Sequence, residues 1–195
     1  MSSYRKIHLY QRLIKPIQKI PIENYKINEY KKESFKIKMC ICIHCYNIDI
    51  FNELMYYVRN FFEFDWQRLK IIIHYVHQDI NKIKKIIEIL CNVNFENDNI
   101  FTFIKGDNIG ADIGGFIRCC EYISDDDDIV SIIHTKTNKI WRRKMMNIFT
   151  KEGIYTSMSL FQSKTHIDSI GTSEKITNFP NIHNYSILIR SICNI

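Results

Sequence analysis

The segment FKIKMCICIH (residues 35–44) decides the fold class of this chain. Its second half is almost entirely apolar, so both faces of an extended strand would carry buried side chains. This pattern is typical of a strand inside a parallel sheet that is covered by helices on both faces. The rest of the sequence therefore has to supply further strands and the helices that connect them.

Three more segments have strand character: NIFTFI (99–104), LKIIIHYV (69–76) and DIVSIIH (128–134). Helical patterns follow the strands at 50–62, at 80–90, from the glycine-rich stretch to Ile123, and at 140–149. HIDSIGTS (166–173) is a candidate fifth strand. Alternation of strands with helices predicts βαβ units. We therefore expect a Rossmann-like α/β fold, with a mostly parallel sheet and helices on both faces.

At 195 residues the chain is long enough for one domain with a substantial core. Residues 35–195 are predicted to form the α/β domain, and residues 1–34 a partly helical N-terminal extension. The extension is weakly amphipathic, which favours packing on its own domain, with peripheral membrane contact as the alternative. Its polar start is no secretory signal, and no apolar run approaches the ~20 residues of a membrane span. A cytoplasmic protein is expected.

The formal net charge of +6 is spread over lysines scattered among isoleucines. Without a basic block or a basic-plus-aromatic module, nucleic acid is not expected as a partner. The seven cysteines show no disulfide spacing and, without a second Cys or His pair, no zinc pattern. Those in CICIHC (40–45) are predicted to be buried thiols that act as small hydrophobes.

Polar and aromatic residues follow the predicted strands, as ligand-binding residues do in open α/β sheets. They are His44-Cys45-Tyr46, Val76-His77-Gln78, Lys105 to Asp112, and His134-Thr135-Lys136. His134 and Lys136 would point to the same side of an extended chain end, where two cations could neutralise a diphosphate leaving group. A solvated strand terminus is the alternative.

NIGADIGGF (108–116) holds glycines 110, 114 and 115 between a strand and a helix. It matches neither the dinucleotide fingerprint nor a P-loop. One interpretation is a ligand cradle, in which the backbone and the helix N–H groups approach an anion. The other is a plain turn in which Asp112 caps the helix and the glycine pair allows close packing. The spacing alone does not choose between them.

The four consecutive aspartates at 125–128 resemble a metal site, but they precede a strand and so lie at the opposite sheet edge. We expect a solvated, self-repelling loop there, with metal binding as the weaker alternative.

The order of blocks resembles the rhamnan-synthesis F family, glycosyltransferase-like proteins of cell-wall and lipopolysaccharide polysaccharide assembly. The resemblance rests on His44-x-Tyr46, NIGADIGGF, IIHTKTNKIWRRKMM (132–146) and IDSIG (167–171). It implies a fold of the glycosyltransferase A type and an enzyme that transfers a sugar from a nucleotide-sugar donor to a glycan or glycolipid acceptor.

The resemblance also implies residue roles. Donor-binding positions would be His44, Tyr46, Asn108, Gly110 and Thr135. Catalytic positions would be Asp112, at the sugar hydroxyls, with His134 and Lys136 at the diphosphate. Trp141 and Arg142 would lie on the acceptor side. In this fold the corresponding strand usually ends in a metal-binding Asp-x-Asp, whereas here a lysine charge stands in its place. Dependence on Mn²⁺ or Mg²⁺ is therefore left open, and no metal ligand is assigned.

Three hypotheses follow. The first is an active glycosyltransferase. The second is a non-catalytic nucleotide- or carbohydrate-binding module derived from such an enzyme, because the chain is short for the family. The third and weakest is a basic protein associated with nucleic acid.

Overall fold

The computed structural model describes residues 34–95, 99–135, 137–163, 169–171 and 187–190. The predicted N-terminal extension lies outside this part of the chain, apart from Ser34.

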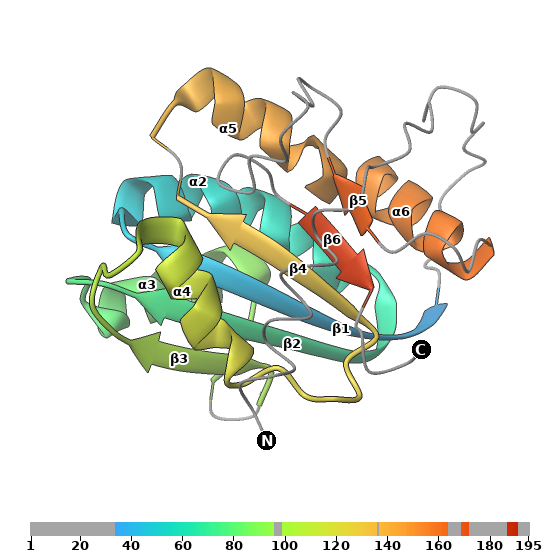
Figure 1. Cartoon of the computed structure of the whole chain (residues 1–195), viewed down its shortest axis with the longest axis horizontal. Coiled ribbons are helices and arrows are strands. Elements are labelled where there is room, and N and C mark those ends of the chain that lie inside the picture. Colours follow the sequence, from blue (N-terminus) through green and yellow to red (C-terminus); the bar gives the residue numbers. More distant parts are fainter. Residues whose placement is uncertain (1–33, 96–98, 136, 164–168, 172–186, 191–195) are drawn as a thin grey trace.

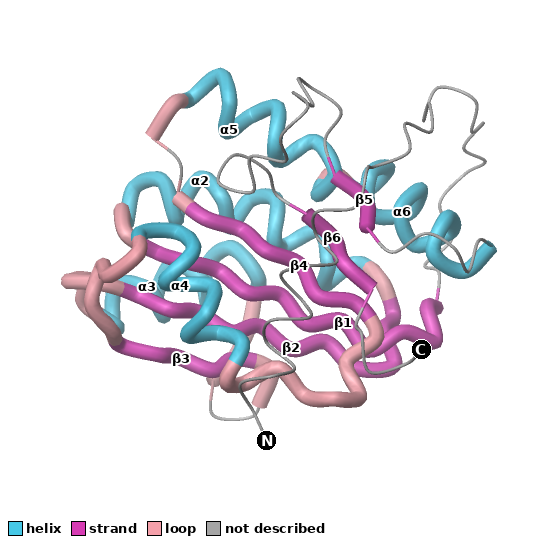
Figure 2. The backbone as a smooth tube through the Cα atoms, viewed as in Figure 1, coloured by secondary structure: helices cyan, strands magenta, loops and turns pink. Residues whose placement is uncertain are grey.

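The described strands form one six-stranded sheet in the order β3-β2-β1-β4-β6-β5 (Figures 1 and 2). Their bounds are β1 Ser34–Cys45, β2 Asp65–Tyr75, β3 Phe101–Lys105, β4 Ile129–His134, β5 Ser169–Gly171 and β6 Ile187–Arg190. Strands β1 to β4 run parallel to one another, whereas β6 is antiparallel to both β4 and β5. The predicted mostly parallel α/β sheet is confirmed.

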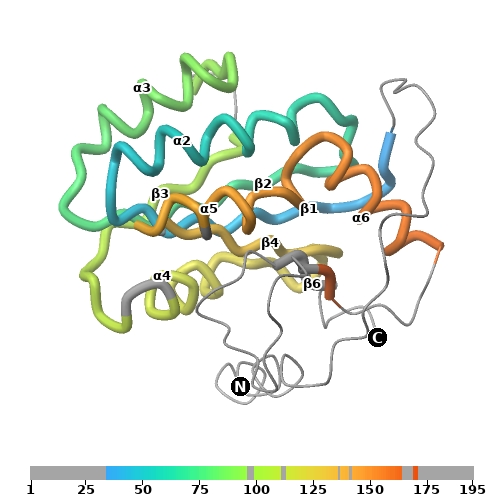
Figure 3. Tube along the Cα trace, turned by 90° about the horizontal axis from the view of Figure 1, so that it is seen from above, coloured from blue at the N-terminus to red at the C-terminus, as the bar shows by residue number. Residues whose placement is uncertain are grey.

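Helices cover both faces of this sheet (Figure 3). Helices α2 (Ile48–Val58) and α3 (Ile80–Cys91) lie on one face, and α4 (Ala111–Cys120) lies on the other, against β1 and β2. A short 3₁₀ helix, η2 (Arg59–Glu63), completes the segment predicted as a helix over 50–62. The segment predicted as 140–149 is α5 (Lys139–Met145) followed by the 3₁₀ helix η3 (Met146–Phe149).

The main core lies between the sheet and the helices α2 and α3 that cover one of its faces. It contains the inward-facing residues of β1, among them Met39, Ile41 and Ile43, packed with Phe51 and Leu54 of α2. A smaller core under α4 contains Cys40 and Cys42 together with Ile72, Cys119 and Val130. Alternation along β1 produces this division, since neighbouring side chains of a strand point to opposite faces.

The prediction that the cysteines of β1 are buried is confirmed. Cys40, Cys42 and Cys45 all lie in the interior. Burial raises the pKa of the Cys45 thiol to about 12. Hydrogen bonds among the thiols of Cys42, Cys119 and Cys40, together with burial, raise the pKa of Cys42 well above its usual value. The Cys42 and Cys45 thiols therefore stay protonated at neutral pH, and the buried cysteines of β1 pack as small apolar groups.

Two described elements were not predicted. Helix α6 (Lys151–Ser163) is rich in Ser, Thr and Gly, which lowers its intrinsic helix propensity. The helix is stabilised by burial of Ile154, Met158 and Phe161 at helical spacing, and by Thr150 Oγ1, which accepts the Gly153 N–H at its start. Strand β6 is the other, and β5 occupies only three residues of the predicted strand 166–173.

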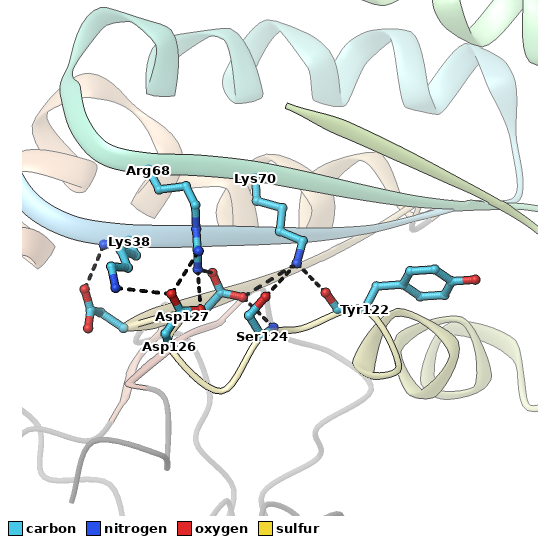
Figure 4. A network of polar contacts seen from close by, with 8 residues as sticks. Lys38, Arg68, Lys70, Tyr122, Ser124, Asp126 and Asp127 are labelled. Atoms are coloured by element: carbon cyan, nitrogen blue, oxygen red, sulfur yellow. Dashed lines mark hydrogen bonds and ion pairs between the residues drawn. The ribbon is translucent and has the colours of Figure 1, made fainter. Parts of the chain in front are cut away.

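The aspartate loop before β4 was expected to be solvated and self-repelling, but it is only partly solvated, and its carboxylates pair with cations (Figure 4). Asp127 is completely buried and accepts a 2.6 Å hydrogen bond from Arg68. Asp126 accepts hydrogen bonds from both Arg68 and Lys38, which lower the pKa of its carboxyl. Lys70 Nζ lies 4.0 Å from Asp127 Oδ2. Cations that project from β1 and β2 neutralise the loop, and among the described residues no group of three or more His, Cys, Asp or Glu side chains is placed to hold a metal ion.

Candidate functional site

The strand order reverses between β1 and β4. The chain moves outward from β1 through β2 to β3, then crosses to β4 on the other side of β1. Such a reversal in an open α/β sheet opens a crevice at the carboxyl ends of the two strands, where ligands bind. The residues at this point are His44 to Tyr46 at the end of β1, and His134 and Thr135 at the end of β4.

Hydrogen bonds hold the chain segments at this point together. The Tyr46 N–H donates to Thr135 Oγ1 at 3.1 Å, and the Tyr46 carbonyl accepts from Gln78 Nε2 at 2.9 Å. The Thr135 N–H donates to the carbonyl of His44 at 3.2 Å. The Tyr46 ring nevertheless stays 48% exposed. An aromatic ring on a rigid backbone at this edge can stack against a planar or sugar ring.

Three buried histidines lie side by side across the same edge. His74 of β2 and His134 of β4 are both in register with His44 of β1, so all three rings project to the α4 face. Their exposed fractions are 0%, 5% and 5% respectively. His44 Nδ1 and His74 Nδ1 are 2.8 Å apart, so the Nδ1–H of one ring donates a hydrogen bond to the Nδ1 lone pair of the other.

The glycine-rich segment forms the loop from β3 into α4. The N-cap residue of α4 is Gly110 and not Asp112. Its φ of +76° is accessible to glycine but strained for other residues. Because the N-cap residue is a glycine, it offers no side-chain acceptor to the first N–H groups of the helix. The suggestion that Asp112 caps this helix was wrong.

The predicted site residues do not all gather at the crevice. Asn108 and Gly110 lie in the exposed loop before α4, and Asp112 lies in the first turn of that helix. Lys136 lies outside the described residues, as do the side chains of Asp112 and Trp141. The rings of His44 and His74, in contrast, lie under α4 and the loop before it, against Gly115 and Gly106.

Arg142 lies apart from the histidines. Its guanidinium is buried and donates to Glu53 Oε2 at 2.6 Å and to the Thr137 carbonyl at 3.2 Å. Glu53 belongs to α2, on the sheet face opposite α4. The pair therefore joins α5 to α2 beside the β4–α5 connection, and the hydrogen bond from Arg142 lowers the pKa of Glu53.

We predict that Glu53→Gln makes the stability of the protein depend less on pH in the acid range. Because the folded-state pKa of Glu53 is lowered, the unfolded chain takes up the proton first, so wild-type stability falls as pH drops below about 5. The variant lacks this contribution, and its melting temperature should approach that of the wild type between about pH 5 and pH 3. Glu88→Gln, at an exposed position of α3, is the control. A difference between wild type and Glu53→Gln that stays constant with pH would contradict the assignment.

His74 was missed by the sequence analysis, which ended the second strand at Val76 and considered His77 and Gln78 instead. A signal was present. Strands β1, β2 and β4 all carry the dipeptide Ile-His at the same register, as Ile43-His44, Ile73-His74 and Ile133-His134. The repeated dipeptide indicates equivalent positions on adjacent strands.

No family model, curated protein or solved structure matches this chain. Within the part of the chain that the structure describes, no helix combines the length and apolar character needed to cross a membrane.

Proposed function

We propose that this protein is a glycosyltransferase that moves a sugar from a nucleotide-sugar donor to a glycan or glycolipid acceptor. The observation that carries the proposal is the fixed, exposed Tyr46 ring at the reversal point between β1 and β4. Ligands of open α/β sheets bind at this point, and a nucleoside offers the flat surface that an exposed aromatic ring can stack against.

The loop between β3 and α4 would hold the phosphates. The N-cap residue of α4, Gly110, has no capping side chain, and a helix N-terminus carries N–H groups and a partial positive charge that suit an anion. In the proposal Lys136 supplies the positive charge for the departing diphosphate. His134 is buried on the α4 face, so we reassign it from the diphosphate to the support of the strand end beside Thr135.

The resemblance to the rhamnan-synthesis F family supplies the remaining roles. Asp112, in the first turn of α4, would accept hydrogen bonds from sugar hydroxyls, and Asn108 and Gly110 would shape that end of the site. Trp141 and Arg142 would lie on the acceptor side, where the Arg142–Glu53 ion pair fixes the start of α5. A glycosyltransferase A type fold and cytoplasmic location belong to the same proposal.

The test is release of nucleotide from UDP-, GDP- and dTDP-sugars, measured with and without Mn²⁺ or Mg²⁺. We expect one donor to be turned over and Lys136→Ala to lower the rate by about 10²–10³, the usual effect of removing one preorganised charge-stabilising group. Asp112→Ala should also abolish release. Lys139→Ala, at an exposed lysine three positions away, is the matched control and should keep the rate.

Two outcomes would overturn the enzyme proposal. Saturable binding of a nucleotide sugar without release of nucleotide would favour the non-catalytic module. A thermal shift detects such binding, because a ligand at 100 times its Kd stabilises the fold by about 2.7 kcal/mol. Salt-sensitive binding to DNA or RNA, with no response to any nucleotide sugar, would exclude both the enzyme and the module.

A further inference from the structure

The His44–His74 pair forms the surface on which α4 and its preceding loop rest. A methyl group at Gly115 of α4 would overlap the His44 ring, and one at Gly106 would overlap His74 Nε2. The two glycines therefore let helix and loop lie directly on the imidazoles. Any movement of either ring has to displace the backbone above it.

The contact between the two rings depends on the number of protons they hold. The rings are nearly parallel, with centroids 5.0 Å apart, and meet through Nδ1 atoms at 2.8 Å. One Nδ1 must carry a hydrogen while the other offers its lone pair, so a doubly protonated pair would place two N–H groups head to head. His74 Nε2 has no hydrogen-bond partner in the described part of the chain, so a protonated His74 would bury an unsatisfied N–H.

The surroundings add to the cost of a positive charge. Burial and, secondarily, the charge of Arg118 on α4 lower the pKa of His74. On β4 the neighbour of His44 is a third histidine, His134, while β3 contributes the apolar Ile104 in register with His74.

Several other ionisable groups lie on the elements around the pair. They are Glu121, which pairs with Arg118 at 3.8 Å, the buried thiols of Cys42 and Cys119, the exposed Asp107 in the loop, and Asp112 in the first turn of α4.

We propose that the His44–His74 pair is a proton-sensitive latch for residues 106–120. The neutral pair holds the loop and α4 on the sheet, and protonation of the pair below about pH 6 releases them, since an unperturbed histidine titrates near 6.5. The released segment includes the loop at the carboxyl edge of the sheet. The latch depends on the histidine contacts alone and does not rest on the proposed function.

Hydrogen–deuterium exchange at pH 7.5 and pH 5.5, corrected for the intrinsic exchange rate, tests the latch. In the wild type we expect protection of residues 106–120 to fall by about tenfold or more, equivalent to ~1.4 kcal/mol of opening free energy, with the centres of β1 and β2 unchanged. His74→Asn keeps a donor near His44 Nδ1 but does not titrate, so its protection should not depend on pH in this way.

His77→Asn is the matched control, because His77 is exposed and its left-handed backbone, with φ of 57°, suits asparagine. It should respond to pH as the wild type does. A second measurement covers the case in which His74→Asn fails to fold: NMR titration of the wild-type histidines should give the pair pKa values below the ordinary value of about 6.5, because the closed segment holds the rings neutral and the open segment takes up the proton first. Protection that falls equally in His74→Asn, a pair that titrates at or above the ordinary histidine value, or protection that does not fall at all would overturn the latch.

Discussion

Asp127→Asn is expected to lower the free energy of unfolding by about 2–4 kcal/mol, because it breaks an ion pair whose carboxylate is completely buried and leaves polar groups unsatisfied. Asp127 Oδ1 accepts from Arg68 at 2.6 Å, and Oδ2 accepts the Ser124 N–H at 2.8 Å. An asparagine can present only one oxygen, so its amide N–H₂ would face one of these donors. Urea denaturation should show a lower midpoint with an unchanged slope.

Asp126→Asn is the matched control for this prediction. Asp126 also bonds to Arg68, but its side chain is 52% exposed, so solvent and salt screen the interaction. Its loss should be much smaller and should shrink further at high salt. Equal losses at the two positions would show that burial of Asp127 does not govern the stability of this loop.

Gly115→Ala is the second large effect, with an expected loss of about 1–3 kcal/mol, the usual cost of overpacking. In an ordinary helix interior the same change stabilises by roughly 0.5–1 kcal/mol, so the sign alone is informative. Here the new methyl group would overlap the His44 ring, and either α4 or the imidazole has to move. Thermal or urea unfolding measures the change.

A double-mutant cycle identifies the origin of that loss. In a His44→Ala background the two ring atoms nearest the new methyl group are removed and only the Cβ of residue 44, at 2.9 Å, remains close, so Gly115→Ala should cost less than in the wild type. Additive effects of the two substitutions would mean that the clash with His44 is not the cause.

The parallel α/β architecture could be predicted because its signals are local. The apolar run of β1 and the periodicity of α3 each depend on residues close together in the chain. Helix α6 could not be assigned in the same way, because its Ser, Thr and Gly residues disfavour a helix and tertiary burial of residues such as Ile154 overrides them. Strand β6 pairs with β4 across nearly 60 positions, and no local pattern specifies such a partner.

The candidate site was predicted in part for the same reason. His44, Tyr46 and Thr135 were placed at one sheet edge, and the structure brings them together. His74 was missed because the strand end was misplaced, and strand ends are the least certain feature of a sequence pattern. The pairing of Arg142 with Glu53 joins two helices 89 positions apart and depends on how both pack.

The sequence by itself determined a helix-covered parallel sheet and the edge at which its polar residues collect, because strand and helix periodicity and the direction of βαβ units follow from short stretches of chain. Only the tertiary structure decided that β1 lies between β2 and β4, that the aspartate loop meets Arg68 and Lys70, and that His44 touches His74. Strand order and register depend on long-range packing. A shift of one residue in register would turn every one of these side chains to the opposite face.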